Sequence, residues 1–147
     1  MSAANNPRGC NCLALRQAAR HVTQFYDQVL APSGIRATQY SILARLERNG
    51  PMTINALAAA LVMDRTTLGR NVLPLQRDGL IAVRPGASDR RSKELHLTDR
   101  GLTRFRAAQK AWVQAQAQFE DAFGVKRSKA LRTLLDDVTL SELAPAS

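Results

Sequence analysis

The feature of the sequence that most limits its fold is a change in the spacing of apolar residues past the middle of the chain. Up to residue 79, apolar residues recur every three or four positions, which is the spacing of helices that bury one face. Residues 80–83 and 95–97 instead form two short apolar runs on either side of turn residues, which predicts a β-hairpin. Helical spacing then returns. This order predicts a mainly α fold of six helices with a small β-hairpin wing, a winged helix-turn-helix.

The helix boundaries follow from capping residues and helix breakers. Thr38, Thr53 and Asp64 are expected to cap the second, third and fourth helices, because their side-chain oxygens can accept hydrogen bonds from free N–H groups of the first turn. The fifth helix begins at residue 98 or 99, ends before Gly124 and reaches roughly 35 Å at about 1.5 Å per residue. That length exceeds what so small a core can cover, and the helix carries an aromatic stripe that includes Trp112 and Phe119.

Length and composition restrict the class of protein. A chain of 147 residues with 45% hydrophobic and 22% charged residues is long enough for one folded domain. The longest apolar runs fall short of the roughly 18 residues that a membrane span needs, and residues 1–9 are expected to form a flexible tail rather than a secretory signal. Cys10 and Cys12 lie too close together to staple a secreted fold. A cytoplasmic protein without a membrane partner is therefore expected.

The charge balance points to a polyanionic partner. Lys and Arg number 21 against 12 Asp and Glu, a net charge of +9, and nucleic acid is the first partner that such a balance suggests. Residues 64–93 hold seven basic and three acidic side chains, so +4 of that charge falls in about a fifth of the chain. No nucleophilic triad, phosphate-binding glycine loop or catalytic carboxylate pair is apparent in the sequence. We therefore expect no enzyme activity, no cofactor and no metal site.

The fourth helix and the hairpin carry the candidate DNA contacts. A recognition helix contacts bases and phosphates mainly from its N-terminal half, where arginine can bind guanine and asparagine can bind adenine. The hairpin is expected to reach the neighbouring minor groove, with Asp89 pairing with an arginine and ordering the tip. The predicted contact residues are Arg65, Thr66, Thr67, Arg70 and Asn71 on the helix and Arg84, Arg90, Arg91 and Lys93 on the hairpin.

Three segments resemble the MarR family of transcriptional regulators: residues 77–81 (RDGLI), the wing 88–93 (SDRRSK) and the exit 97–101 (LTDRG). The resemblance covers about residues 12–143. It implies an obligate-type homodimer joined through an N-terminal helix at 10–34 and C-terminal helices at 99–147, with a DNA-binding lobe at 35–98. The aromatic stripe of the fifth helix, with Trp112 and Phe119, is accordingly assigned to the dimer core. The resemblance also makes Arg91 the first candidate for a minor-groove arginine and Arg90 the second. Two recognition helices related by a two-fold axis would read a pseudo-palindromic operator.

The resemblance implies a sequence-specific double-stranded-DNA-binding repressor that a small organic ligand releases. An aromatic or carboxylate effector would bind between the dimer helices and the lobe, with Arg16, His21, Tyr26 and Tyr40 as candidate liners. The alternative class is a non-specific architectural nucleic-acid-binding protein, which would bind scrambled DNA as tightly as its site.

The two cysteines suggest a different switch. Cys12 is expected to open the first helix. Cys12 and the residues after it resemble the reactive-cysteine segment of the organic-hydroperoxide-sensing branch of the family. The N-terminal end of a helix favours the thiolate, which an oxidant converts to a sulfenic acid, and Cys10 of the other subunit is the candidate thiol to trap it. Binding of a soft metal by both thiols and a purely structural role are the remaining alternatives.

Overall fold

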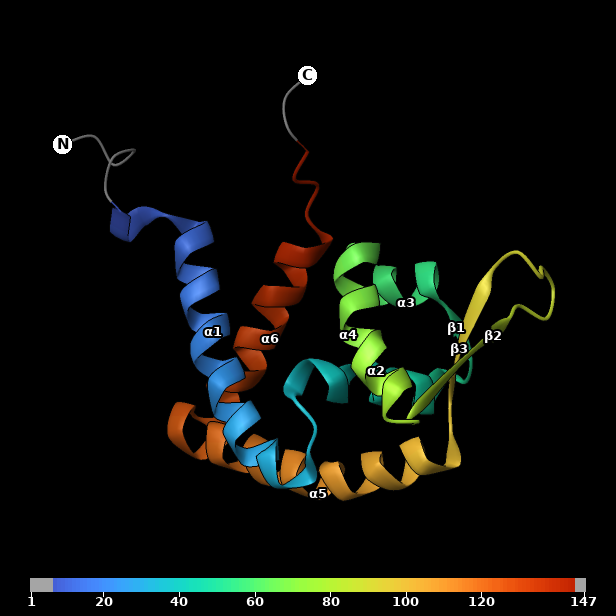
Figure 1. Cartoon of the computed structure of the whole chain (residues 1–147). Helices are drawn as coiled ribbons and strands as arrows, with labels where there is room; N and C mark the ends of the chain where they lie inside the picture. The colour runs from blue at the N-terminus through green and yellow to red at the C-terminus, as the bar shows by residue number, and fades with distance from the viewer. Residues whose placement is uncertain (1–6, 145–147) are drawn as a thin grey trace. The chain divides into compact units, whose positions relative to one another are not determined.

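The structure is a computed structural model that describes residues 7–144, so residues 1–6 of the expected tail lie outside the described residues. The chain divides into two compact units, with the boundary between Trp112 and Val113 inside one long helix. Figure 1 follows the elements of both units by colour. The elements of the first unit are η2 (Pro7–Gly9), α1 (Asn11–Leu30), η3 (Ala31–Ser33), α2 (Ala37–Asn49), β1 (Met52–Thr53), α3 (Ile54–Ala60), α4 (Arg65–Arg77), β2 (Ile81–Pro85), β3 (Lys93–Leu97) and the first half of α5 (Asp99–Phe123).

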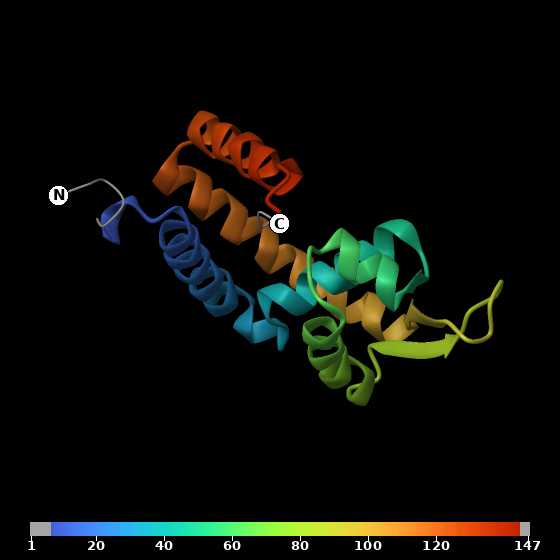
Figure 2. The same ribbon diagram turned by 90° about the horizontal axis from the view of Figure 1, so that it is seen from above.

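The predicted hairpin is confirmed, and a third strand joins it. β2 and β3 pair antiparallel from Ile81 opposite Leu97 to Pro85 opposite Lys93. The two-residue strand β1 adds to the other edge of β3, which gives the order β1-β3-β2. Figure 2 shows the loop between β2 and β3 extending beyond the helices of this unit as the wing.

The core of the first unit lies between the helix-turn-helix, the sheet and the start of α5. The fourth helix buries the residues that its spacing predicts, Leu68, Val72 and Leu75. The other buried side chains come from every neighbouring element and include Leu30, Ile35, Ile42, Leu43, Leu46, Leu57, Leu80, Ile81, Leu95 and Phe105. This shared core fixes α4 against the sheet that carries the wing.

Two of the three predicted caps are confirmed. The side chain of Thr53 accepts a hydrogen bond from the N–H of Ala56 at 3.1 Å, and Asp64 caps α4. The prediction that Thr38 caps the second helix is wrong, because α2 begins at Ala37 with Arg36 as its N-cap. The N–H of Ala37 donates instead to Oδ1 of Asp27 on α1, at 2.7 Å. A carboxylate ten residues upstream therefore satisfies the start of α2 and ties it to α1.

A threonine and a glycine join the wing to α5. The hydroxyl of Thr98 donates to the carbonyl of Gly79 at 2.7 Å and accepts the N–H of Gly101 at 2.9 Å. A Cβ on Gly101 would overlap the carbonyl oxygen of Leu80, so only glycine lets α5 start this close to the sheet.

The second unit holds the rest of α5 and α6 (Val125–Leu140), separated by Gly124 at a φ of 105°. The hydroxyl of Ser128, which is buried in the first turn of α6, donates to the carbonyl of Gly124 at 2.6 Å. The guanidinium of Arg127 lies 4.2 Å from the centre of the Phe123 ring. Across residues 7–144, no helix is long and apolar enough to cross a membrane.

Candidate nucleic-acid interface

The start of α4 is organised by one carboxylate. Oδ1 of Asp64 accepts the N–H of Thr67 at 2.7 Å, and Oδ2 accepts the Thr67 hydroxyl at 2.8 Å. These hydrogen bonds, first the one from the backbone N–H, lower the pKa of the Asp64 carboxyl. The side chain of Asn71 donates to the carbonyl of Thr67 at 2.9 Å. Two of the five predicted base-contacting residues, Thr67 and Asn71, are therefore engaged by their own helix.

The other three predicted residues of α4 face solvent. Arg65, Thr66 and Arg70 are exposed. Thr66 and Arg70 lie on the side of the helix away from the buried stripe, and Arg65 is the first residue of the helix. Among the described residues none of them forms an ion pair or a side-chain hydrogen bond. Their polar groups are free to contact an external ligand.

The wing tip is ordered by Asp89 through the backbone. Oδ1 of Asp89 accepts the N–H of Arg91 at 3.0 Å, and its carbonyl accepts both the N–H and the hydroxyl of Ser92, at 3.1 and 2.7 Å. We expected Asp89 to pair with an arginine side chain, and the structure differs. The Asp89 carboxylate closes an Asx turn instead, because the backbone N–H of Arg91 is a nearer donor. Arg90, Arg91 and Lys93 therefore stay exposed around a fixed turn.

The wing and the helix-turn-helix meet at a hollow of about 410 Å³. It brings together three predicted cations, Arg65 from α4 and Arg91 and Lys93 from the wing, with Asp89 as the one acidic neighbour. The remaining lining residues are Thr53, Ile54, Asn55 and Ser92. Thr53 and Asn55 were missed as site residues, since they enter the site only because β1 pairs with β3.

Not all predicted contacts line this hollow. Thr66, Arg70 and Arg90 lie outside it, as does Arg84, which stands on β2 opposite Glu94. The carboxylate of Glu94 accepts the N–H of Ala87 at 3.1 Å and lies 3.3 Å from Nε2 of His96. Glu94 is therefore engaged by partners within the wing.

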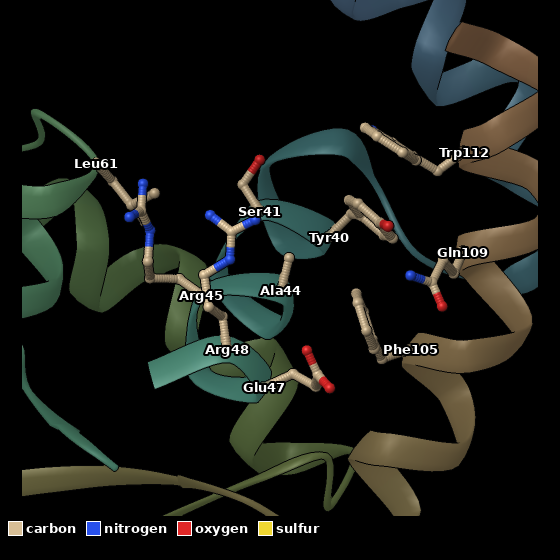
Figure 3. Close-up of a pocket in the computed structure, with 10 residues that line it drawn as sticks. All are labelled: Tyr40, Ser41, Ala44, Arg45, Glu47, Arg48, Leu61, Phe105, Gln109 and Trp112. Atoms are coloured by element: carbon tan, nitrogen blue, oxygen red, sulfur yellow. The ribbon is translucent and has the colours of Figure 1, made fainter. Parts of the chain in front are cut away.

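A second hollow of about 450 Å³ lies between α2 and the start of α5 (Figure 3). Tyr40 stacks on Trp112, with ring centres 5.7 Å apart, and its ring centre is 5.2 Å from that of Phe105. Burial, and secondarily the charge of Glu47, raise the pKa of Tyr40. Arg45 and Arg48 add two cations to the lining.

The predicted effector residues are thus separated. Tyr40 lines the hollow, whereas Arg16, His21 and Tyr26 stand on α1 and do not. The residues that accompany Tyr40 come from α2, α5 and Leu61 instead. Trp112, assigned to a dimer core from the sequence, is part of this wall.

Both cysteines are exposed free thiols at the start of α1. We expected Cys12 to open the helix, but Cys10 is the capping residue, and its Sγ accepts the N–H of Leu13 at 3.4 Å. Cys12 lies in the first turn. Within residues 7–144, no group of three or more His, Cys, Asp or Glu side chains is placed to hold a metal ion.

Comparison with known proteins gives a consistent family. The sequence model of the MarR family matches residues 35–93, from just before α2 to the start of β3. The crystal structure of the transcriptional regulator MosR from M. tuberculosis is 34% identical, and the match covers 88% of this chain and 95% of MosR with a TM-score of 0.76. MosR in complex with DNA is 36% identical over 90% of this chain and 99% of that one, with a TM-score of 0.74. The chain belongs to the MarR family.

Two bacterial transcriptional regulators are similar to this chain at lower coverage. PecS of Dickeya dadantii, an HTH-type transcriptional regulator, is 29% identical over 115 residues, which are 76% of this chain and 69% of PecS. YwoH of Bacillus subtilis, an uncharacterized HTH-type transcriptional regulator, is 31% identical over 84 residues. This match spans 61% of the length of YwoH. MarR-family members are transcriptional regulators rather than enzymes, as the sequence predicted. The resemblance of Cys12 to the peroxide-sensing branch stays a prediction.

Proposed function

We propose that this MarR-family protein is a repressor that binds a pseudo-palindromic operator in double-stranded DNA as a homodimer. The observation that carries the proposal is the hollow between wing and helix-turn-helix, where Arg65 of α4 and Arg91 and Lys93 of the wing converge. Cations from two elements at one hollow suit a ligand that carries many negative charges. The structure of MosR with DNA supports the same partner class.

The roles of the two elements differ. Arg65, Thr66 and Arg70 are free to contact base edges in the major groove, where arginine binds guanine in a bidentate manner. Arg90 and Arg91 extend from the fixed turn of the wing and suit the negative potential of a narrow minor groove. Thr53 and Asn55, beside the same hollow, suit phosphate oxygens.

The homodimer is supported by exposed apolar side chains on α1 and on α6. Residues 11–20 of α1 are all exposed, Leu13 and Leu15 among them, and on α6 Leu134 is 62% and Leu140 82% exposed. A second copy would remove this surface from water. Sedimentation equilibrium should give a dimer for the wild type, and Leu134→Asp should shift it toward monomer, while a monomeric wild type would contradict the proposal.

The test of DNA recognition is selection of duplexes from a random library, followed by affinity measurements at several salt concentrations. The wild type should select a pseudo-palindrome and bind it far more tightly than a scrambled duplex. Arg70→Ala should weaken the discrimination, whereas Arg106→Ala removes an equal charge from an exposed position on α5 and should change little. Equal affinity for both duplexes would support the architectural alternative and refute the repressor.

Release by a small aromatic carboxylate is the form of regulation that the second hollow favours. Tyr40, Phe105 and Trp112 offer stacking surfaces, and Arg45 and Arg48 offer partners for a carboxylate (Figure 3). Because α2 forms one wall of this hollow and also packs against α4, a ligand that displaces α2 would disturb the recognition helix.

Trp112 is the single tryptophan of the chain, so its fluorescence reports on this hollow directly. Benzoate should change the emission of Trp112 and release the selected duplex over the same concentration range, and cyclohexanecarboxylate should act more weakly. Arg45→Ala with Arg48→Ala should raise the benzoate concentration needed, with Arg106→Ala as the matched control. An unchanged emission with DNA still bound would refute release through this hollow.

Oxidation is the alternative means of release, favoured by the exposure of both sulfurs at the start of α1. The Cys12 thiolate would attack the terminal oxygen of an organic hydroperoxide and break its O–O bond. With one proton taken from water, this gives a sulfenic acid and the corresponding alcohol. Condensation with Cys10 of the partner subunit would then form a disulfide and expel water. Cumene hydroperoxide should release DNA from the wild type but not from Cys12→Ser, and thiol should restore binding. Release from Cys12→Ser would refute this route.

A further inference from the structure

The outward face of α4 contains two residues that the fold itself does not need. Four side chains follow one another along this face at spacings of four, three and four residues: Thr66, Arg70, Leu73 and Arg77. This stripe lies about 200° around the helix from the buried one, because successive residues turn by about 100°. Gly69 stands beside it, one turn before Leu73.

Gly69 has no structural reason to be glycine. Positive φ angles or close neighbours account for the glycines at positions 34, 50, 79, 86, 101 and 124. A Cβ at position 69 would meet no atom within 4 Å, and the residue sits inside a helix. Glycine is the poorest helix former after proline, so alanine would suit the free protein better. The missing side chain therefore leaves room for another molecule to approach the backbone of α4 closely.

Leu73 is the apolar member of a stripe that is otherwise polar. Its side chain is 63% exposed, and it follows Gly69 by four residues, which places the two on neighbouring turns of one face. A single exposed leucine is ordinary on a protein surface. Beside a bare stretch of backbone on the recognition helix, however, it forms an apolar patch between Arg70 and Arg77. In the major groove, the apolar group that such a patch can meet is the C5-methyl of thymine.

We propose that Gly69 and Leu73 determine operator specificity: Gly69 lets α4 approach the base edges closely, and Leu73 reads a thymine methyl. This inference rests on the proposed function, since it assigns a role to α4 within the same DNA complex. The contacts of Gly69 and Leu73 differ from those of the arginines. Their contribution to DNA affinity comes from close apolar packing and should not depend on the salt concentration.

The first test sets stability against affinity in Gly69→Ala. The substitution should raise the thermal midpoint by about 2–4 °C and lower affinity for the selected duplex roughly tenfold. Affinity for a scrambled duplex should stay unchanged. Gln76→Ala, at an exposed position of α4 outside the stripe, should leave the affinity unchanged as a matched control. Wild-type affinity in Gly69→Ala would overturn the role of Gly69.

The second test replaces each thymine of the selected half-site by deoxyuridine, which deletes one methyl group. The wild type should lose about fourfold in affinity at the contacted thymine, the value for one buried methyl. Leu73→Ala should become insensitive at that position while keeping its sensitivity elsewhere. If Leu73→Ala keeps the full wild-type pattern, Leu73 does not read a methyl. If the wild type selects no consensus, the proposed function fails instead, so the two failures are distinct.

Discussion

The same substitution, glycine to alanine, should have opposite effects at two helical positions of this chain. At Gly69 a Cβ meets nothing, whereas at Gly101 it overlaps the carbonyl oxygen of Leu80 and approaches Cδ1 of Leu97 to 2.8 Å. The obstacle at Gly101 is backbone, so it cannot rotate away as a side chain would. Moving it disturbs the exit from the wing.

The magnitudes follow from these neighbours. Replacing glycine by alanine inside a helix gains about 1 kcal/mol, and at Gly69 nothing opposes that gain. At Gly101, forcing a methyl into a filled space costs about 1–3 kcal/mol. The displaced Leu80 carbonyl also accepts hydrogen bonds from the N–H and the hydroxyl of Thr98, at 3.2 and 3.1 Å, each worth about 1 kcal/mol. We expect Gly101→Ala to lose about 2–4 kcal/mol and Gly69→Ala to gain about 1.

Urea unfolding followed by far-ultraviolet circular dichroism measures the stability of both variants. One fixed protein concentration is used, because the proposed dimer would make the midpoint depend on concentration. The two free energies of unfolding should differ by about 3–5 kcal/mol, with the denaturant dependence unchanged. Wild-type stability in Gly101→Ala would mean that α5 does not approach Leu80 as described. Lower stability in Gly69→Ala would mean that Gly69 has a role within the chain, which would also remove the argument for its role in DNA contact.

Three further perturbations test single contacts. Arg91→Ala should weaken binding to selected and scrambled duplexes alike and reduce the slope of log K against log salt by about one; an unchanged slope would remove Arg91 from the interface. The lowered pKa of Asp64 means that its carboxylate stabilises the fold above its unfolded pKa of about 4, and that this contribution is lost as the pH falls through the folded value. Asp64→Asn should therefore lose less stability than the wild type between about pH 5 and 2, and parallel acid titrations would contradict this. Thr98→Val removes the hydrogen bonds to Gly79 and Gly101 and should lose about 1–3 kcal/mol in urea unfolding, with equal stability as the refuting result.

Features set by local sequence were predictable, and features set by distant partners were not. Thr53 and Asp64 cap their helices because the donors lie three residues away, so the sequence pattern contains the whole interaction. The start of α2 depends on Asp27, ten residues upstream on another helix. Strand β1 has two residues and exists only through its pairing with β3, so no periodicity could indicate it.

The same distinction applies to the candidate site. Residue type and position predicted Arg65, Arg91 and Lys93, which the fold brings to one hollow. Thr67 and Asn71 have the right chemistry for base contacts, but each finds a partner within its own helix. Such local hydrogen bonds compete with contacts to an external ligand. The type of residue alone does not predict which of the two a side chain makes.

The contacts that hold the DNA-binding elements to α1 and α5 also suggest how regulation would reach them. Asp27 anchors the start of α2, and Thr98 anchors the start of α5 to the end of α4 through Gly79. Arg104 on α5 adds a hydrogen bond of 3.4 Å to the carbonyl of Ser33, just before α2. The hollow lined by Tyr40 lies between α2 and α5, the two helices that these contacts fix. A ligand there would act on helices held at their ends, so a small displacement at the hollow would be carried toward α4 instead of being absorbed by loose connections.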